Sequence, residues 1–283
     1  MQIHSTPKGK LIPIGGAEKR HETPKTAADM QALDNKLVVL QRVLEEAKGT
    51  ATRLEVLTTA SSIPEVVANE FLCSFQNLGC QSVGVMNIRT RKQALQKEYL
   101  SRLEQADALY FSGGNQMKIT RAFLDTAFGE IMKKRYYEES DFVIAGTSAG
   151  AMMMSSAMIY EGTSKEAMTS GKAKITKGME LLPQSIIDTH FVNRNRLGRL
   201  MVGVVEYNDH IGIGLAEDTG VIITAGNYLE CIGSGQVSLV DGRELVKEMQ
   251  NEHNPKPHLH FERMIHHIMT AGQKYDVRGG VFY

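Results

Sequence analysis

The chain has 283 residues, a length that suits one large α/β domain or two small ones. Hydrophobic residues make up 42% of it and charged residues 23%, which is typical of a globular protein and excludes a disordered one. Lysine plus arginine and aspartate plus glutamate number 32 each, which excludes a chain-wide field attracting nucleic acid or an anionic membrane. Any electrostatic recognition of a ligand must therefore be local.

The cysteines and the N-terminus indicate the compartment. Cys73, Cys80 and Cys231 lack a zinc-ligand spacing and are typical of a reducing environment. The N-terminus has no apolar stretch of the signal-peptide kind, and the longest apolar runs are too short to span a membrane. We therefore expect a cytoplasmic protein with neither a membrane nor a nucleic acid as partner.

Short apolar runs alternate with helical periodicity over the first half of the chain. The apolar runs predict strands at Leu11–Ile14, Leu54–Ala60, Ser82–Ile88, Ala108–Phe111 and Phe142–Ala145. The periodic stretches predict helices at Ala28–Lys48, Pro64–Gly79, Arg91–Gln105 and Gln116–Phe128. Strands without polar alternation, separated by helices, predict a doubly wound, mostly parallel sheet that is covered on both faces.

The pattern changes in the second half of the chain. Thr163–Gly178 is polar and predicts a surface excursion, and Ile186–Phe191 predicts a short strand leading into a basic helix. Apolar runs separated by turn glycines over Ile211–Gly242 predict an antiparallel C-terminal extension of the same sheet. Glu262–Thr270 predicts a helix. No linker or internal repeat interrupts the chain, so we expect a single domain over 1–283 with its core at about 10–242.

The strongest local signal is the run Gly146-Thr147-Ser148-Ala149-Gly150. It follows a buried strand and precedes small and apolar residues, which is the nucleophile-elbow pattern. The glycines permit a sharp turn, and a helix N-terminus near Ser148 favours negative charge. The N–H of Ala149 then points to where an oxyanion would form. The alternative is that Ser148 only caps the helix, since serine is a favoured N-cap.

A nucleophilic serine requires a base and an orienting acid. Among nine histidines, His190 ends a predicted strand at the edge where parallel-sheet enzymes assemble their sites, although an edge histidine without chemistry is the alternative. His253, His258 and His260 lie in a proline-bearing tail, which we interpret as a solvated loop, because no flanking ligand pattern supports a metal site.

Two adjacent carboxylates are candidates for the acid. Glu217 and Asp218 follow a predicted strand that ends at Ala216. Adjacent residues of a strand point in opposite directions, so only one of the two is expected to face the base. The spacing leaves the choice between them open.

Five segments occur in the order seen in cyanophycinases: Lys10–Arg20, Tyr110–Gln116, Ala145–Met152, Asp188–Leu200 and Gly214–Asp218. From about Lys10 to Gln236 the chain thus resembles this family of serine peptidases, which also includes α-aspartyl dipeptidases. The resemblance implies a flavodoxin-like sheet related to class I glutamine amidotransferases. It implies a triad of Ser148, His190 and Glu217, an oxyanion hole shared by Ala149 and Gly114, and no metal or organic cofactor.

Family members hydrolyse cyanophycin, a poly-aspartate backbone with arginine on each side-chain carboxyl, to β-Asp-Arg dipeptides. Such a substrate presents carboxylates and guanidinium groups. Arg194, Arg196 and Arg199 are expected to bind the carboxylates, since arginine forks bind them bidentately. Asp188 is expected to hold a guanidinium, and Gln116 to bind the substrate backbone. The alternatives are a solvated helix face for the arginines and a strand-end turn residue for Asp188.

Other functions stay open at this point. An aspartyl or isoaspartyl dipeptidase would share the triad, and Thr189 and Asn115 stand where cyanophycinases often have glutamine and aspartate. An α/β-hydrolase esterase would need a late histidine such as His258 or His260, because in that fold the acid precedes the histidine. A catalytically dead module that captures acidic peptides is a third alternative. A homodimer is expected only by analogy.

Overall fold

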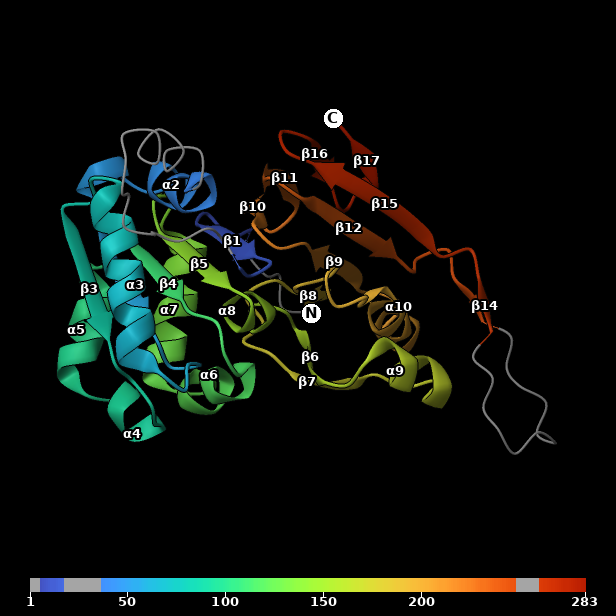
Figure 1. The fold of residues 1–283 in the computed structure, drawn as a ribbon, viewed down its shortest axis with the longest axis horizontal. Helices are drawn as coiled ribbons and strands as arrows, with labels where there is room; N and C mark the ends of the chain where they lie inside the picture. The colour runs from blue at the N-terminus through green and yellow to red at the C-terminus, as the bar shows by residue number, and fades with distance from the viewer. Residues whose placement is uncertain (1–5, 18–36, 248–259) are drawn as a thin grey trace.

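The computed structural model describes residues 6–17, 37–247 and 260–283. Over these ranges the chain forms two main sheets that lie side by side, one of nine strands and one of four, with helices packed around them (Figure 1). No helix in the described ranges has the length and apolar character needed to cross a membrane.

Five strands of the larger sheet run parallel to one another. They are β1 (Lys10–Ile14), β2 (Arg53–Leu57), β3 (Ser82–Met86), β4 (Ala108–Phe111) and β5 (Val143–Thr147), in the spatial order β1-β5-β4-β2-β3. Ile14 of β1 lies opposite Thr147 of β5, so both strands end at the same edge of the sheet. The prediction of an α/β fold with a mostly parallel central sheet is confirmed.

Four antiparallel strands extend this sheet beyond β1. They are β10 (Thr219–Thr224), β11 (Tyr228–Gly233), β16 (Lys274–Asp276) and β17 (Val281–Phe282). β10 pairs with β1, and the others follow in order toward the edge. The predicted antiparallel extension is therefore confirmed for β10 and β11.

The rest of the predicted extension belongs to the smaller sheet, so the expectation of one common sheet was wrong. This sheet has the order β15-β12-β9-β8 and contains β8 (Ser185–Asp188), β9 (Ile211–Leu215), β12 (Gln236–Asp241) and β15 (Ile265–Thr270). The chain leaves β9 for the larger sheet at Ala216 and returns after Gly233, whose φ of 95° suits only glycine readily. Glu217 lies at the first of these crossings.

The helix predicted at Glu262–Thr270 was also wrong, because this stretch contains β15. Its residues pair antiparallel with β12, from Gln236 opposite Thr270 to Asp241 opposite Ile265. The more buried and more exposed residues alternate along it, as a strand requires. Pairing with an available sheet edge thus outweighed the local helical pattern.

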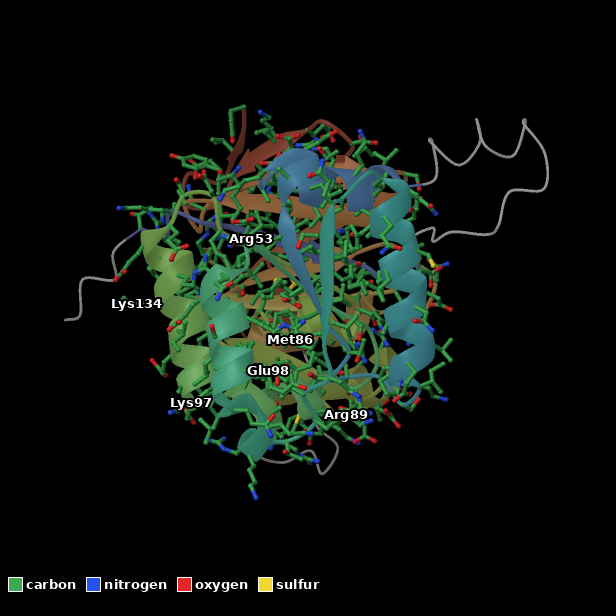
Figure 2. All side chains as sticks on the ribbon, turned by 90° about the vertical axis from the view of Figure 1, so that its left-hand side faces the viewer. Arg53, Met86, Arg89, Lys97, Glu98 and Lys134 are labelled. Atoms are coloured by element: carbon green, nitrogen blue, oxygen red, sulfur yellow. The ribbon has the colours of Figure 1, made fainter. Side chains whose placement is uncertain are left out.

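Helices cover both faces of the larger sheet. One face packs against α2 (Val38–Glu45) and α3 (Pro64–Asn77), and the other against α5 (Lys97–Gln105), α6 (Gln116–Phe123) and α7 (Ala127–Glu138). Figure 2 looks onto the β3 edge and shows α3 on one side of the sheet and α5 and α7 on the other. The hydrophobic cluster of the second face continues into the smaller sheet, which also packs against α10 (Leu197–Glu206).

Some predicted helices differ in their boundaries. Of the helix predicted at Ala28–Lys48, residues 28–36 lie outside the described ranges and the rest contains α2. The helix predicted at Arg91–Gln105 is split into α4 (Arg91–Ala94) and α5. Thr90 caps α4, and Thr126 caps α7, a helix that the sequence analysis did not predict.

The polar stretch Thr163–Gly178 contains α9 (Ser164–Ser170) and β7 (Lys174–Lys177). β7 pairs with β6 (Ala157–Glu161), and α9 packs against α10. Two short strands, β13 (Val246–Lys247) and β14 (Phe261–Glu262), form a further pair. The predicted surface excursion is therefore an ordered wall beside α10. The prediction of one domain over 1–283 includes residues outside the described ranges and stays a prediction.

Candidate active site

Ser148 stands at the tip of a tight turn between β5 and the short helix α8 (Ala149–Met152). Its φ of 52° and ψ of −109° are unusual for a residue with a side chain, and such strain persists only where the surroundings enforce it. Its N–H donates to the carbonyl of Ile14 at 2.9 Å. The side chain makes no capping hydrogen bond to α8. The turn therefore presents the Ser148 hydroxyl to the space above the sheet edge.

Two glycines make this turn sterically feasible. A Cβ atom on Gly146 would lie 2.5 Å from the carbonyl oxygen of Gly150. A Cβ atom on Gly150 would lie 2.2 Å from the carbonyl oxygen of Phe111, on the neighbouring strand. In both cases the obstacle is backbone, which cannot rotate away as a side chain can. The glycines predicted to shape the turn are thus required by close contacts on both sides of Ser148.

Ser148, His190 and Glu217 form one hydrogen-bonded chain. Nε2 of His190 lies 3.1 Å from Oγ of Ser148, and Nδ1 lies 2.7 Å from Oε1 of Glu217. His190 is mostly buried, with 12% of its side chain exposed. This arrangement suits general-base activation of a hydroxyl, since the imidazole can take the serine proton while the carboxylate stabilises the resulting cation.

His190 lies two residues beyond the end of β8, at the junction of the two sheets. Its N–H donates to the carbonyl of Gly15 at 2.7 Å, which ties the β8 end to the β1 end. Gly16 packs against the imidazole, and a Cβ atom there would lie 2.5 Å from Nε2. Gly16 also has a φ of 101°, where other residues are strained. The glycine pair after β1 therefore sets the position of the His190 imidazole.

The two acidic candidates point to different partners. Glu217 faces His190, and its second oxygen accepts a hydrogen bond from Nδ2 of Asn193 at 2.9 Å. Asp218 instead accepts from the hydroxyl of Ser234 at 2.7 Å, and its N–H donates to the carbonyl of Gly16. Of the two carboxylates between which the spacing could not decide, Glu217 is therefore the one that contacts His190.

The residues expected to form an oxyanion hole lie next to Ser148. Ala149 is the first residue of α8, where backbone N–H groups have no partner within the helix. Gly114 lines the same cleft as Ser148 and has a φ of 137°. A Cβ atom on Gly114 would lie 2.2 Å from the carbonyl oxygen of Ala60. A Cβ atom on Gly113 would lie 3.5 Å from the Cβ atom of Ser148, so the glycine turn is next to the serine.

A cleft of about 410 Å³ opens beside Ser148. Its walls come from the α6 start, the β6–α9 segment and the turn before α10. They carry both charges, with lining residues Gly114, Gln116, Ser148, Met152, Tyr160, Glu161, Gly162, Thr163, Glu166, Lys174, Arg194, Arg196 and Arg199. The serine and the arginines predicted from the sequence therefore share one cleft.

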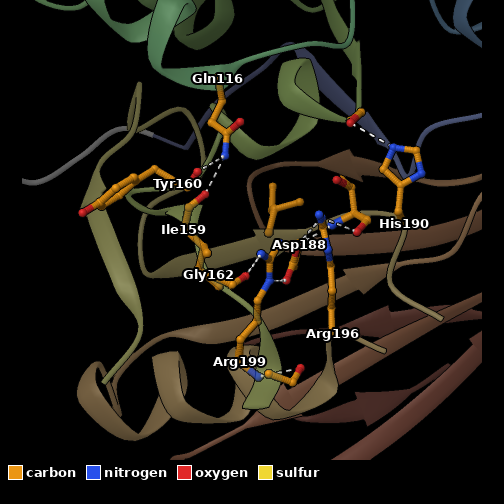
Figure 3. A network of polar contacts seen from close by, with 12 residues as sticks. Gln116, Ile159, Tyr160, Gly162, Asp188, His190, Arg196 and Arg199 are labelled. Carbon is orange, nitrogen blue, oxygen red and sulfur yellow. Dashed lines mark hydrogen bonds and ion pairs between the residues drawn. The ribbon is translucent and has the colours of Figure 1, made fainter. Parts of the chain in front are cut away.

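Asp188 lies at the floor of this region and is fully buried. Figure 3 shows two arginines converging on its carboxylate. Arg199 binds it bidentately, with Nε at 2.6 Å and Nη2 at 2.5 Å, and Nη1 of Arg196 lies 3.0 Å from Oδ1. The backbone N–H of Thr189 donates to the same carboxylate at 2.8 Å. Asp188 thus holds guanidinium groups of its own chain and is not exposed to a substrate.

The other residues expected to bind substrate differ in how firmly the protein holds their side chains. Arg199 also donates to the carbonyl of Gly162 at 2.6 Å, which fixes it against the β6–α9 segment. Nε2 of Gln116 donates to the carbonyl of Ile159 at 2.8 Å, as Figure 3 shows. Arg194 is exposed and lines the cleft. Arg194 is therefore the arginine of the three that is most accessible to a ligand.

The charge balance of the floor is positive. Burial lowers the pKa of the Arg196 guanidinium, attraction to Asp188 opposes this, and repulsion by Arg199 and Arg194 adds to it. An arginine guanidinium nevertheless keeps its charge near neutral pH. The Asp188 carboxylate is paired with two guanidinium groups, and Arg194 adds a third to the cleft. The surplus of positive charge beside Ser148 favours a substrate that carries a carboxylate.

Sequence reasoning missed several residues of this site. Asn193 contacts Glu217, and the pair of Lys174 and Glu161, joined at 3.0 Å, lines the cleft wall. A signal existed for Asn193, which lies three residues after His190 in a polar turn. No such signal existed for Lys174 and Glu161, because the pairing of β6 with β7 that brings them to the cleft cannot be predicted from the local sequence pattern.

Of the three tail histidines, the described part of the chain includes only His260. His253 and His258 lie outside the described residues, and His260 lies 3.5 Å from Glu262. No cluster of three or more histidine, cysteine or acidic side chains within the described ranges is arranged to hold a metal ion. His260 therefore does not supply the late histidine that an α/β-hydrolase esterase would require.

Known proteins resemble this chain in sequence and in fold. Residues 28–230 match the model of peptidase family S51. Cyanophycinase from Geminocystis herdmanii is 29% identical over 269 residues, which cover 95% of this chain and 94% of the relative. Cyanophycinase from Trichormus variabilis is 28% identical over 277 residues, or 98% and 88% of the two chains.

Two solved structures share the fold. A peptidase from an acI-B1 actinobacterium superposes with a TM-score of 0.61 at 17% identity, covering 98% of this chain and all of that one. A peptidase E protein from Listeria monocytogenes superposes with a TM-score of 0.52 at 14% identity, covering 80% and 99%. The family match extends over well more than half of the chain and includes the elbow and the His190 turn. The chain belongs to peptidase family S51, a family of serine peptidases.

Proposed function

We propose that the chain is a cyanophycinase-like serine peptidase that hydrolyses the poly-aspartate backbone of cyanophycin to β-Asp-Arg dipeptides. The observation that carries this proposal is the chain of hydrogen bonds from Ser148 through His190 to Glu217. Ser148 lines a cleft that also contains three arginines. The relatives named above, which match nearly the full chain, are called cyanophycinases and support the same substrate class.

The first half of the reaction is acylation of the serine. His190 takes the proton of the Ser148 hydroxyl as its oxygen attacks the carbonyl carbon of an aspartyl peptide bond. Glu217 holds the imidazole in the productive orientation and stabilises its cation. The N–H groups of Gly114 and Ala149 bind the developing oxyanion. His190 then gives the proton to the leaving amine, and the acyl-enzyme remains.

The second half reverses these roles with water as nucleophile. A water molecule gives a proton to His190 and attacks the ester carbonyl, and the same N–H groups bind the second oxyanion. Collapse of the intermediate returns the proton to Ser148 and releases the acid product. The residues of this chain supply every proton transfer in the sequence, so the reaction needs no cofactor.

Substrate carboxylates are bound by the arginines of the cleft floor. Arg194 is exposed there, and Arg196 and Arg199 present fixed guanidinium edges because Asp188 holds them. This assigns Asp188 a different role from the one the sequence suggested, since its carboxylate orients the arginines. Glu166 and Glu161, the latter paired with Lys174, also line the cleft, where a substrate guanidinium can approach them.

The test is incubation of the purified protein with insoluble cyanophycin, followed by mass spectrometry of the soluble products. Wild type should release β-Asp-Arg, and Ser148→Ala should reduce the rate by about 10⁴-fold or more. A folded wild-type protein that leaves the polymer intact but cleaves aspartyl dipeptides would move the assignment to the dipeptidase branch. Equal activity of Ser148→Ala and wild type would exclude the proposed nucleophile.

A further inference from the structure

We propose that Asn193 is a positioning residue for the reaction, because its amide holds the Glu217 carboxylate in the orientation that His190 needs. Nδ2 of Asn193 donates to Oε2 of Glu217 at 2.9 Å, while Oε1 lies 2.7 Å from Nδ1 of His190. Each oxygen of the carboxylate thus has its own partner. The inference rests on the proposed function in requiring that Ser148 is activated through His190.

The orientation of Glu217 is not secured by burial. Its side chain is 31% exposed, whereas that of His190 is 12% exposed. An open groove of about 490 Å³ borders its outer side, and Asn193 and Glu217 are among the residues that line it. Water in this groove can compete for the carboxylate. A glutamate also has one more rotatable bond than an aspartate, so a second anchor restricts it more.

Asn193 is well placed to be that anchor because it shares a turn with the base. The carbonyl of His190 accepts a hydrogen bond from the N–H of Arg194 at 3.0 Å, and Arg196 donates to Phe191 at 3.0 Å. These bonds close the turn around Asn193. The imidazole and the amide are therefore fixed relative to each other, and both reach across to the same carboxylate on the β9 side of the junction.

The contact acts on orientation and not on substrate binding. Asn193 lines the outer groove, while the described lining of the Ser148 cleft does not include it. Its amide is neutral, so it leaves the charge of the site unchanged. Loss of the amide should therefore lower the rate of serine acylation while the half-saturating substrate concentration stays the same.

The probe is p-nitrophenyl acetate, an activated ester that reports acylation of Ser148 whatever the natural substrate is. Stopped-flow release of p-nitrophenol is followed for the full chain with Asn193→Ala, Asn193→Asp and, as an exposed asparagine outside the site, Asn208→Ala. Asn193→Ala should slow acylation about tenfold, as expected for loss of one hydrogen bond to a charged group. Asn193→Asp keeps the shape but removes the donor, and should slow it at least as much. Asn208→Ala should match wild type.

A double-mutant cycle separates positioning from a general structural effect. In a Glu217→Ala background, Asn193→Ala should cause no further loss, because the group through which it acts is absent. An equal loss in both backgrounds, an unchanged rate in Asn193→Ala, or a rise in the half-saturating concentration alone would overturn the inference and leave the proposed function standing. Equal acylation of wild type and Ser148→Ala would overturn both.

Discussion

The two halves of the candidate site are held in place by different kinds of force. Ser148 comes from the larger sheet, and its turn is fixed by close backbone packing at Gly146 and Gly150. His190 and Glu217 come from the ends of β8 and β9 in the smaller sheet. Hydrogen bonds and ion pairs surround them. The first half is thus held by steric packing and the second by a polar network. The two halves meet at Gly15 and Gly16, where the N–H of His190 donates to the carbonyl of Gly15.

The difference matters because the two kinds of force respond differently to change. Close packing tolerates no added atom, but it is insensitive to charge and to pH. A polar network tolerates changes of shape at its rim, but the loss of one buried partner leaves another charge unpaired. Substitutions in each half, each with a control variant of the same residue type elsewhere, should therefore separate the two halves.

The largest effect is expected from Asp188→Ala in the polar half. This change leaves the guanidinium groups of Arg196 and Arg199 without their carboxylate, and the side chain of Arg199 is only 7% exposed. Removing one member of a buried ion pair typically costs about 3–5 kcal/mol. The free energy of unfolding in urea should fall by about this amount, and activity should fall with it.

A matched control for this prediction is Asp209→Ala, because the side chain of Asp209 is 64% exposed. It should change the free energy of unfolding by no more than about 0.5 kcal/mol. Similar losses for the two variants would contradict the idea that the buried network stabilises the polar half.

Gly150→Ala tests the steric half. Alanine favours a helix over glycine by about 1 kcal/mol, so propensity alone would predict stabilisation of α8. The new Cβ atom would however lie 2.2 Å from the carbonyl oxygen of Phe111, and overpacking costs about 1–3 kcal/mol. We expect net destabilisation in urea unfolding. A shift of about 1 Å at Ser148 should also lower turnover about 100-fold.

Gly203→Ala in α10 is the control, since its closest neighbours would be methyl groups of Ile175 and Ile186 at 3.3 Å. These are side-chain ends that can move by a few tenths of an ångström, so the change should be nearly neutral. If Gly150→Ala is equally neutral in stability and in activity, packing at Phe111 does not hold the nucleophile turn.

The comparison also explains what the sequence could predict. The elbow is encoded in five consecutive residues, so its strand, its turn and the place of Ser148 at the tip could be predicted from the local pattern. The parallel strands were readable for the same reason, because each is a short continuous apolar run. Contacts between residues far apart in the chain had no such local signature.

The polar half contains the features that the local sequence pattern could not predict. Choosing between Glu217 and Asp218 required either the family resemblance or the crossing of the chain between two sheets at Ala216. The burial of Asp188 depends on α10 folding back so that Arg199 reaches it. The strand at Ile265–Thr270 was misread as a helix because its partner, β12, lies well over 20 residues earlier in the chain.

The smallest expected effect extends the comparison to the far end of the smaller sheet. Asp241 ends β12, is 4% exposed, and accepts hydrogen bonds from the Arg243 side chain at 2.5–3.0 Å. Burial alone would raise the pKa of this carboxyl, but the side-chain and backbone hydrogen bonds and the charge of Arg243 outweigh it. The pKa is therefore lowered from its ordinary value of 3.8.

A carboxyl whose pKa is lower in the folded than in the unfolded chain contributes stability above the unfolded value and loses it as the pH falls through the folded value. Near neutral pH, Asp241→Asn should therefore be less stable than wild type by about 1 kcal/mol, a small figure because the side chain of Arg243 is 44% exposed. The difference should shrink as the pH falls below the ordinary carboxyl pKa of 3.8 and through the lower folded value. Urea unfolding across this range, with the exposed Asp141→Asn as control, measures it. If the difference in the free energy of unfolding between Asp241→Asn and wild type stays constant with pH, the ion pair does not stabilise this end of the sheet. The stabilising polar network would then be limited to the surroundings of His190.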